Sequence, residues 1–310
     1  MLPNTTLSDN SRGILYMLAT VTGFAFGDTF VKLASADLSI AQIIIIRSLI
    51  AVPVVALVAW HQSAFTGIRQ MAERFIALRA VGEVGATAIY LTALVHLDIA
   101  NATAILQIVP LATTAIAALL LGEPVGIRRW VAIGLGFLAV LMIVRPGMEG
   151  FNSWSLLALA SVGFIVLRDL SSRLLPAATH PIAVSTLSLV VMIPLGFAML
   201  PFQSWEPLTT RAIIYCGVSG LFLSAAFVSI TLAMRHGEVA VVAPFRYAIL
   251  LWAVALQIAI FGVWPDSLTL IGSALLVATG LYTLYRERKI KGGNTATLAS
   301  VSTTAVTPPT

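Results

Sequence analysis

The chain is a succession of apolar stretches, each about as long as a lipid bilayer is thick. A helix needs about 20 predominantly apolar residues to cross the hydrocarbon core. The sequence predicts an all-α membrane protein with ten transmembrane helices, at residues 13–35, 39–60, 74–95, 100–121, 128–145, 152–174, 181–202, 211–232, 239–261 and 267–285. If a short stretch such as 128–145 re-enters the membrane instead of crossing it, the chain has eight or nine spans.

The composition agrees with a lipid environment. Only 10% of the 310 residues are charged, against about 25% in soluble domains. The net charge of +5 comes from basic residues in short loops and at the C-terminus, with no basic stripe interleaved with aromatics, so no nucleic-acid partner is expected. The first apolar run carries Asp28 and Lys32 and lacks a clear cleavage site, which indicates a retained helix and not a signal peptide.

The distribution of Lys and Arg predicts the orientation. With ten spans, both termini lie on one side of the membrane, and the opposite side carries only Lys32, Arg145 and Arg211. We therefore expect cytoplasmic termini and a bacterial inner-membrane location. The terminal side collects the other loop and tail cations: Arg12, Arg69, Arg74, Arg128, Arg129, Arg173, Arg235, Arg286, Arg288, Lys289 and Lys291.

The sequence repeats itself at a nearly constant offset. A shift of 141 residues carries Asp28 onto Asp169 and Pro53 onto Pro194, and a shift of 140 carries His96 onto His236. Each half then holds five helices, and because five is odd the second half enters the membrane in the opposite sense, as in many secondary transporters. We predict an N-terminus at 1–12, a first repeat at 13–147, a second at 148–287 and a disordered tail at 288–310.

Ionisable side chains inside the predicted spans are candidates for function. A charge at the bilayer centre costs about 2.5–3.5 kcal/mol on insertion scales, so such groups usually face the protein interior or a hydrated cavity. Opposite charges four residues apart lie on one helix face. They either lock helices together or couple transport to protons through Asp28, Glu83 or Asp169. The pairs with this spacing are Asp28–Lys32, Arg79–Glu83 and Asp169–Arg173.

Two arginines, Arg47 and Arg246, have no acidic neighbour one turn away on their own helices. Each needs a carboxylate on another helix, a hydrated cavity or an anionic solute. Near Arg246, Pro244 interrupts helical hydrogen bonding and frees carbonyls that can line a cavity. An arginine beside aromatic rings suits a planar or anionic ring compound, with plain aromatic packing as the alternative. The predicted substrate-binding residues are Arg246, Tyr247, Phe245, Arg47, Gln107 and Trp252.

Motifs of enzyme chemistry are missing from the sequence. There is no GxSxG, HExxH or Walker A loop, and a single cysteine, Cys216, allows no disulfide within one chain. No catalytic residue, cofactor or metal site is therefore expected. The histidines fall between the predicted spans, where metal binding is the alternative to an ordinary loop role: His61, His96, His180 and His236.

The end of each half resembles the EamA family of the drug/metabolite transporter superfamily. Residues 119–147 read LLLGEPVGIRRWVAIGLGFLAVLMIVRPG, and residues 261–288 are similar, although Val263 stands where members often carry glutamate. Residues 27–33 and 243–247 resemble a bacterial subgroup that includes carriers proposed for riboflavin and S-adenosylmethionine. The resemblance implies two inverted five-helix repeats around a central cavity and secondary transport of small metabolites.

The expected function is therefore transport of a small organic solute by alternating access. A vitamin such as riboflavin, taken up by the cell, is the first candidate. Transport of amino acids, S-adenosylmethionine or drugs by export or exchange is the alternative. A membrane sensor, scaffold or enzyme is the alternative class, and a homodimer is left open.

Overall fold

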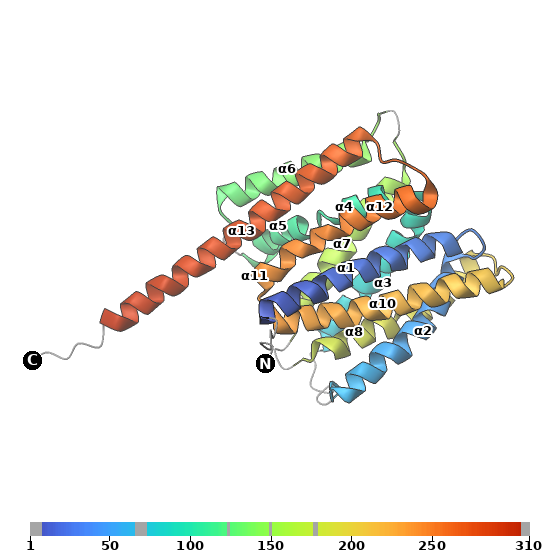
Figure 1. The fold of residues 1–310 in the computed structure, drawn as a ribbon, viewed down its shortest axis with the longest axis horizontal. Helices are drawn as coiled ribbons and strands as arrows, with labels where there is room; N and C mark the ends of the chain where they lie inside the picture. Colours follow the sequence, from blue (N-terminus) through green and yellow to red (C-terminus); the bar gives the residue numbers. More distant parts are fainter. Residues whose placement is uncertain (1–7, 66–72, 123–124, 149–150, 176–178, 305–310) are drawn as a thin grey trace, which may run out of the picture.

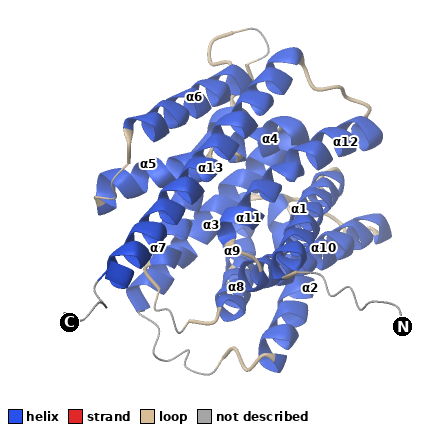
Figure 2. Ribbon diagram, turned by 60° about the vertical axis from the view of Figure 1, so that its left-hand side comes forward, coloured by secondary structure: helices blue, strands red, loops and turns tan. Residues whose placement is uncertain are grey.

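The structure, a computed structural model, describes residues 8–65, 73–122, 125–148, 151–175 and 179–304. All regular elements in these ranges are helices (Figure 2). Ten helical segments among the described residues are long and apolar enough to cross a membrane, which confirms the predicted number. The segments are Asp9–Ala34, Ile40–His61, Arg74–His96, Ile99–Leu120, Ile127–Val144, Trp154–Arg173, Pro181–Phe202, Thr210–His236, Ala243–Phe261 and Ser267–Arg286.

Several spans are single helices. In the first half these are α1 (Asp9–Ala34), α2 (Ile40–His61), α3 (Glu73–His96) and α6 (Ile127–Val144). In the second half they are α7 (Trp154–Arg173), α10 (Thr210–His236) and α13 (Ser267–Thr304).

Three other spans are interrupted near a proline. The fourth divides into α4 (Ile99–Leu106) and α5 (Val109–Leu121), and the seventh into α8 (Pro181–Val190), α9 (Met192–Met199) and the 3₁₀ turn η2 (Leu200–Phe202). The ninth consists of α11 (Val239–Val242), the 3₁₀ helix η3 (Ala243–Ala248) and α12 (Ile249–Phe261). Proline removes a backbone donor and so weakens the helical ladder at these points.

Helix α13 runs past the rest of the bundle in Figure 1 and continues to Thr304. Residues 305–310 lie outside the described part, and the disordered tail expected at 288–310 stays a prediction. Extension of an existing helix needs no new nucleus, which explains why a polar segment can follow a transmembrane helix in helical form.

The bundle contains two extensive antiparallel helix pairs, α1 with α10 and α3 with α7 (Figure 1). Glycines allow close approach: a Cβ on Gly23 would lie 2.8 Å from the Phe222 carbonyl, and one on Gly82 would lie 2.7 Å from the Arg168 nitrogen. Small residues of this kind are typical of membrane helix interfaces. The 140-residue offset carries α1 onto α7 and α3 onto α10, so the two pairs correspond to each other. The inverted repeat itself stays a prediction.

The bundle has two ends, a terminal face and a distal face. At the terminal face α1 begins and α10 ends, and the Glu238 backbone nitrogen donates to Asn10 Oδ1 at 2.9 Å. At the distal face α1 ends and α10 begins, and Arg211 bonds Asp37. Because consecutive spans alternate in direction, α3 and α8 also begin at the terminal face.

Candidate functional site

The first candidate cluster joins three helices through Asp28. The Tyr90 hydroxyl of α3 donates to the Asp28 carboxylate of α1 at 2.9 Å. Arg47 of α2 is only 7% exposed and interacts electrostatically with Asp28. The Nε atom of Arg47 has no hydrogen-bond partner in the described part of the chain. Arg47 thus lies within electrostatic range of a carboxylate on another helix, and its partner stays a prediction.

Asp28 and Lys32, four residues apart on α1, form no ion pair with each other in the described part of the chain, and their role in transport stays a prediction. Lys32 Nζ donates to the carbonyl oxygens of Leu94, at 3.2 Å, and Leu97 at the end of α3. It also lies 5.9 Å from the centre of the Phe261 ring. Free carbonyls at a helix C-terminus carry partial negative charge and attract a cation. A neighbouring helix end therefore competes with the i,i+4 carboxylate for the same ammonium group.

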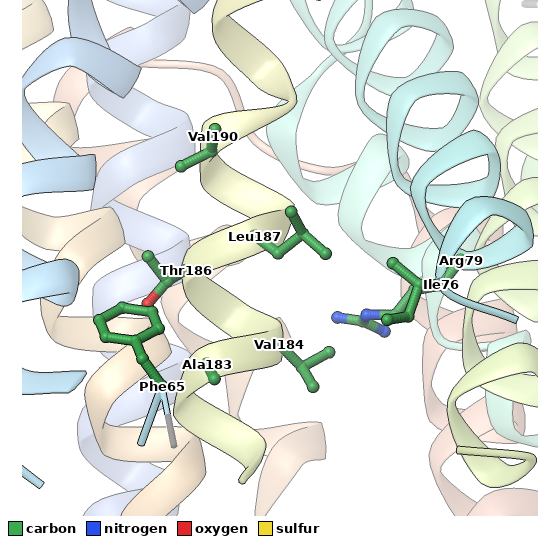
Figure 3. Close-up of a pocket in the computed structure, with 8 residues that line it drawn as sticks. All are labelled: Phe65, Ile76, Arg79, Ala183, Val184, Thr186, Leu187 and Val190. Carbon is green, nitrogen blue, oxygen red and sulfur yellow. The ribbon is translucent and has the colours of Figure 1, made fainter. Parts of the chain in front are cut away.

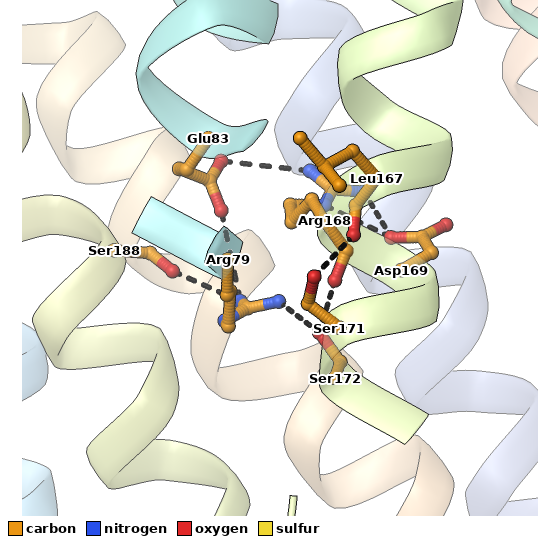
Figure 4. A network of polar contacts seen from close by, with 8 residues as sticks. All are labelled: Arg79, Glu83, Leu167, Arg168, Asp169, Ser171, Ser172 and Ser188. Carbon is orange, nitrogen blue, oxygen red and sulfur yellow. Dashed lines mark hydrogen bonds and ion pairs between the residues drawn. The ribbon is translucent and has the colours of Figure 1, made fainter. Parts of the chain in front are cut away.

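The second cluster is a four-residue charge network between α3 and α7 (Figure 4). Arg79 lies 3.6 Å from Glu83, which confirms that i,i+4 pair. Arg168 lies 3.5 Å from Glu83 and 2.8 Å from Asp169. Two guanidinium groups and two carboxylates thus neutralise one another inside the bundle, as intramembrane charges require. The pairing of Asp169 with Arg173 stays a prediction.

Close helix packing and hydroxyl groups position this network. Gly82 and Gly85 of α3 face Phe164 and Arg168 of α7 with no room for a side chain. The neighbouring carboxylate of Glu83, 8% exposed, is thereby brought within reach of α7. Arg79 also donates to Ser172 of α7 and Ser188 of α8. Arg79 therefore connects three helices.

The two clusters are electrostatically linked. Arg47 lies within electrostatic range of both Asp28 and Glu83. A series of alternating charges therefore runs through the interior from α1 and α2 to α3 and α7. Such buried ionisable groups mark solute or ion pathways in membrane proteins.

A pocket lies between α3 and α8 at the terminal face, with a volume of about 210 Å³. Figure 3 shows Arg79 reaching into the space between these helices from the α3 side. The described residues that line it are Phe65, Ile76, Arg79, Ala183, Val184, Thr186, Leu187 and Val190.

The distal face is closed by polar contacts between distant segments. Arg211 bonds Asp37 at 2.7 and 3.0 Å, and these hydrogen bonds hold the pKa of the Asp37 carboxyl below its ordinary value of 3.8. Gln42 Nε2 donates to the Glu206 carbonyl at 2.7 Å. Gln257 Oε1 accepts from the Ala100 nitrogen at 2.8 Å, where α12 meets the start of α4.

The aromatic residues predicted for solute binding do not gather around the charges. Tyr247 is buried against α13, where a Cβ on Gly280 would overlap its hydroxyl. Trp252 contacts Phe26 at 5.3 Å between ring centres. Residues two positions apart on a helix are rotated by about 200°, so Phe26 points to the side of α1 opposite Asp28.

The remaining predicted residues lie in separate places. Arg246 and Phe245 of η3 are exposed, and no hydrogen bond or ion pair of Arg246 occurs with any described residue. Gln107 is buried at the break between α4 and α5, where its Nε2 donates to the Thr103 carbonyl at 3.3 Å. Arg173 is exposed at the end of α7. Their roles in transport stay predictions.

Sequence reasoning missed Arg168, Tyr90 and the serines that bond Arg79. Arg168 stands inside a predicted span, so the cost of burying a charge was a signal that could have identified it. Tyr90 and the serines carry no such signal, because hydroxyl groups are common in membrane helices. In the described part of the chain no three His, Cys, Asp or Glu side chains are grouped to hold a metal ion.

Comparison with known proteins relates the chain to bacterial transporters. It is 25% identical over 194 residues to an S-adenosylmethionine uptake transporter of Rickettsia prowazekii, covering 62% of this chain and 65% of that protein. It is 25% identical over 284 residues to a riboflavin transporter of Vibrio cholerae, covering 90% and 94%. It is also 25% identical over 270 residues to a pseudopaline exporter of Pseudomonas aeruginosa, covering 84% and 92%.

The chain also shares its fold with a protein of known structure and part of its sequence with a known family. A protein of known crystal structure superposes with a TM-score of 0.60 at 17% identity, over 90% of this chain and 99% of that one, which shows a common fold. Residues 11–145 match the EamA-like transporter family. The resemblance to the EamA family of the drug/metabolite transporter superfamily is thereby confirmed, with residues 11–145 as the part that matches the family itself.

Proposed function

We propose that the chain is a secondary transporter for a small organic metabolite in a bacterial inner membrane. The observation that supports this most strongly is the charge network of Arg79, Glu83, Arg168 and Asp169 between α3 and α7, with the buried Arg47 on the neighbouring α2. A passive scaffold does not need these groups. Each intramembrane charge costs free energy, and such charges usually mark a solute or ion pathway.

In the proposed mechanism the structure corresponds to one state of an alternating-access cycle. The pocket between α3 and α8 opens towards the terminal face, while Asp37–Arg211 and Gln42–Glu206 close the distal face. With cytoplasmic termini, this state faces the cytoplasm. The two halves then act as inverted repeats that rock around the charge clusters.

Riboflavin uptake is the first substrate candidate, supported by the relative from Vibrio cholerae, which matches over nearly its whole length. S-adenosylmethionine uptake and export of an amino-acid-like metabolite are the second candidates, supported by the other two relatives. Because a secondary carrier follows its gradients, relatives with opposite directions are compatible with one mechanism. Proton coupling would act through Asp28, Glu83 or Asp169.

The decisive experiment measures uptake of labelled riboflavin and, separately, S-adenosylmethionine into strains that cannot make them. Expression of the chain should restore uptake of one compound, and a protonophore should reduce that uptake if protons drive it. Asp28→Asn should abolish uptake, whereas Arg128→Gln, at the exposed start of α6, should leave it unchanged. Failure to move any tested metabolite in either direction would favour a sensor or scaffold.

A further inference from the structure

The pocket between α3 and α8 ends at an incompletely neutralised cation. Arg79 is 13% exposed, and its paired carboxylate, Glu83, lies 3.6 Å away, beyond normal hydrogen-bond distance. Glu83 is shared with Arg168 at 3.5 Å. The Nε atom of Arg79 is buried and has no hydrogen-bond partner among the described residues.

Arg168 is better neutralised than Arg79. Its Nε and Nη2 atoms both bond one oxygen of Asp169, at 2.9 and 2.8 Å. Arg79 instead holds two neutral hydroxyl groups, those of Ser172 and Ser188. A guanidinium bound only to hydroxyl groups gains from a carboxylate, because the carboxylate adds an opposite charge and its two oxygens match the planar guanidinium fork.

The walls of the pocket are apolar. Ile76 lines the α3 side, and Val184, Leu187 and Val190 line the α8 side, as Figure 3 shows. The volume of about 210 Å³ is smaller than the ~300–1,000 Å³ of pockets that enclose whole drug-sized ligands. The pocket therefore suits a small acid or one end of a larger solute.

We propose that this pocket binds the carboxylate of an amphipathic organic acid and that Arg79 determines this specificity. The planar carboxylate matches the guanidinium fork, while the apolar part of the solute contacts the α8 wall. The bound carboxylate replaces Ser188 as the partner of Arg79. This inference rests on the proposed transport function and narrows its substrates to metabolites that carry an acid group beside an apolar body.

The test compares two probes of equal size, phenylacetate and phenylacetamide, which differ in charge. The purified full chain is placed in nanodiscs of uncharged lipid, and binding is titrated by saturation-transfer NMR. Phenylacetate should bind about tenfold or more tightly than the amide, because its carboxylate adds the attraction of opposite charges to the hydrogen bonds that the amide oxygen also accepts. Equal binding of the two probes, or of neither, would overturn the proposal.

Variants separate a binding role from a structural one. Arg79→Gln should abolish the preference for the acid, and Arg79→Lys should retain part of it. Arg74→Gln is the matched control, because Arg74 is an exposed arginine on the same helix and outside the pocket. Ser188→Ala removes the competing hydroxyl but keeps the cation, so it should bind the acid at least as tightly. Loss of binding in Ser188→Ala with a folded protein, or an unchanged preference in Arg79→Gln, contradicts the proposal.

Two further experiments show which molecule occupies the pocket and test the carboxylate site separately from the transport function. Adding phosphatidylglycerol to the nanodiscs should not displace phenylacetate; displacement would assign the pocket to a lipid headgroup. Riboflavin uptake that persists in Arg79→Gln and ignores phenylacetate would reject the carboxylate site but leave transport intact. Binding of phenylacetate without transport of any metabolite would reject the transport function alone.

Discussion

The interface of α2 with α10 and the interface of α3 with α8 are repeat-equivalent by the 140-residue offset, yet they differ. Helix α10 lies tightly against α2, where a Cβ on Gly220 would lie 2.7 Å from the Arg47 carbonyl. Helix α3 touches α8 sparsely, and the pocket separates them. Two interfaces that correspond under this offset therefore differ, one closed and one holding a pocket, which is the asymmetry that the proposed alternating-access cycle requires.

The largest expected effect is on the open side, at Arg168. Arg168→Ala removes the cation that pairs with both Glu83 and Asp169. Breaking a buried ion pair costs about 3–5 kcal/mol, because the remaining carboxylates stay desolvated. Thermal unfolding in detergent should show a clear loss of stability relative to the wild type. Arg128→Ala, on an exposed side chain, is the control; equal stability of both variants would mean that the network contributes little.

A second effect, of about 1–3 kcal/mol, is expected at the closed interface. Gly220→Ala forces a methyl group against the Arg47 carbonyl and should separate α2 from α10. Gly163→Ala is the matched control, since nothing lies within 4 Å of its Cβ position and alanine favours the helix. Unfolding temperatures of the two variants should move in opposite directions. If Gly220→Ala behaves like the control, the two interfaces do not differ in tightness.

A smaller effect concerns the polar contacts that close the distal face. Asp37→Arg or Arg211→Asp places like charges together and should widen the distal face, whereas the double exchange should restore it. The distance between spin labels at the exposed Ala36 and Ser204, in a Cys216→Ala background, reports the change. Labels at Arg74 and Pro181 report the terminal face, which should narrow as the distal face widens. Independent movement of the two faces would contradict a rocking mechanism.

The smallest effect is the pH dependence of the same contact. The pKa of Asp37 is lowered in the closed state by hydrogen bonds from Arg211. Its contribution to closure is therefore complete above the ordinary pKa of 3.8 and disappears as the pH falls through the lowered value. The Ala36–Ser204 label distance should lengthen on acidification below about pH 4, and Asp37→Asn should remove that step. A step that survives in Asp37→Asn belongs to another group.

The sequence predicts the number and position of the spans because hydropathy is additive along the chain. It also identifies Asp28, Glu83 and Arg47 as charges that need partners, because the cost of burial depends on residue type alone. The choice of partner depends on how each helix is rotated against its neighbours. Lys32 therefore bonds the end of α3 instead of Asp28, although the i,i+4 spacing suits that pair, and Trp252 contacts Phe26 of α1.

The hydrogen bonds from Lys32 to the last carbonyls of α3 affect how α1 can move. They fasten α1 to α3 near one end, and the Asp28–Tyr90 bond lies only about 6 Å further along. The rest of α1, from Asp28 back to its first residue Asp9, is roughly 30 Å long. Because α1 packs against α10 along its length, the pair would move together, and a swing of about 10° would displace its far end by roughly 5 Å.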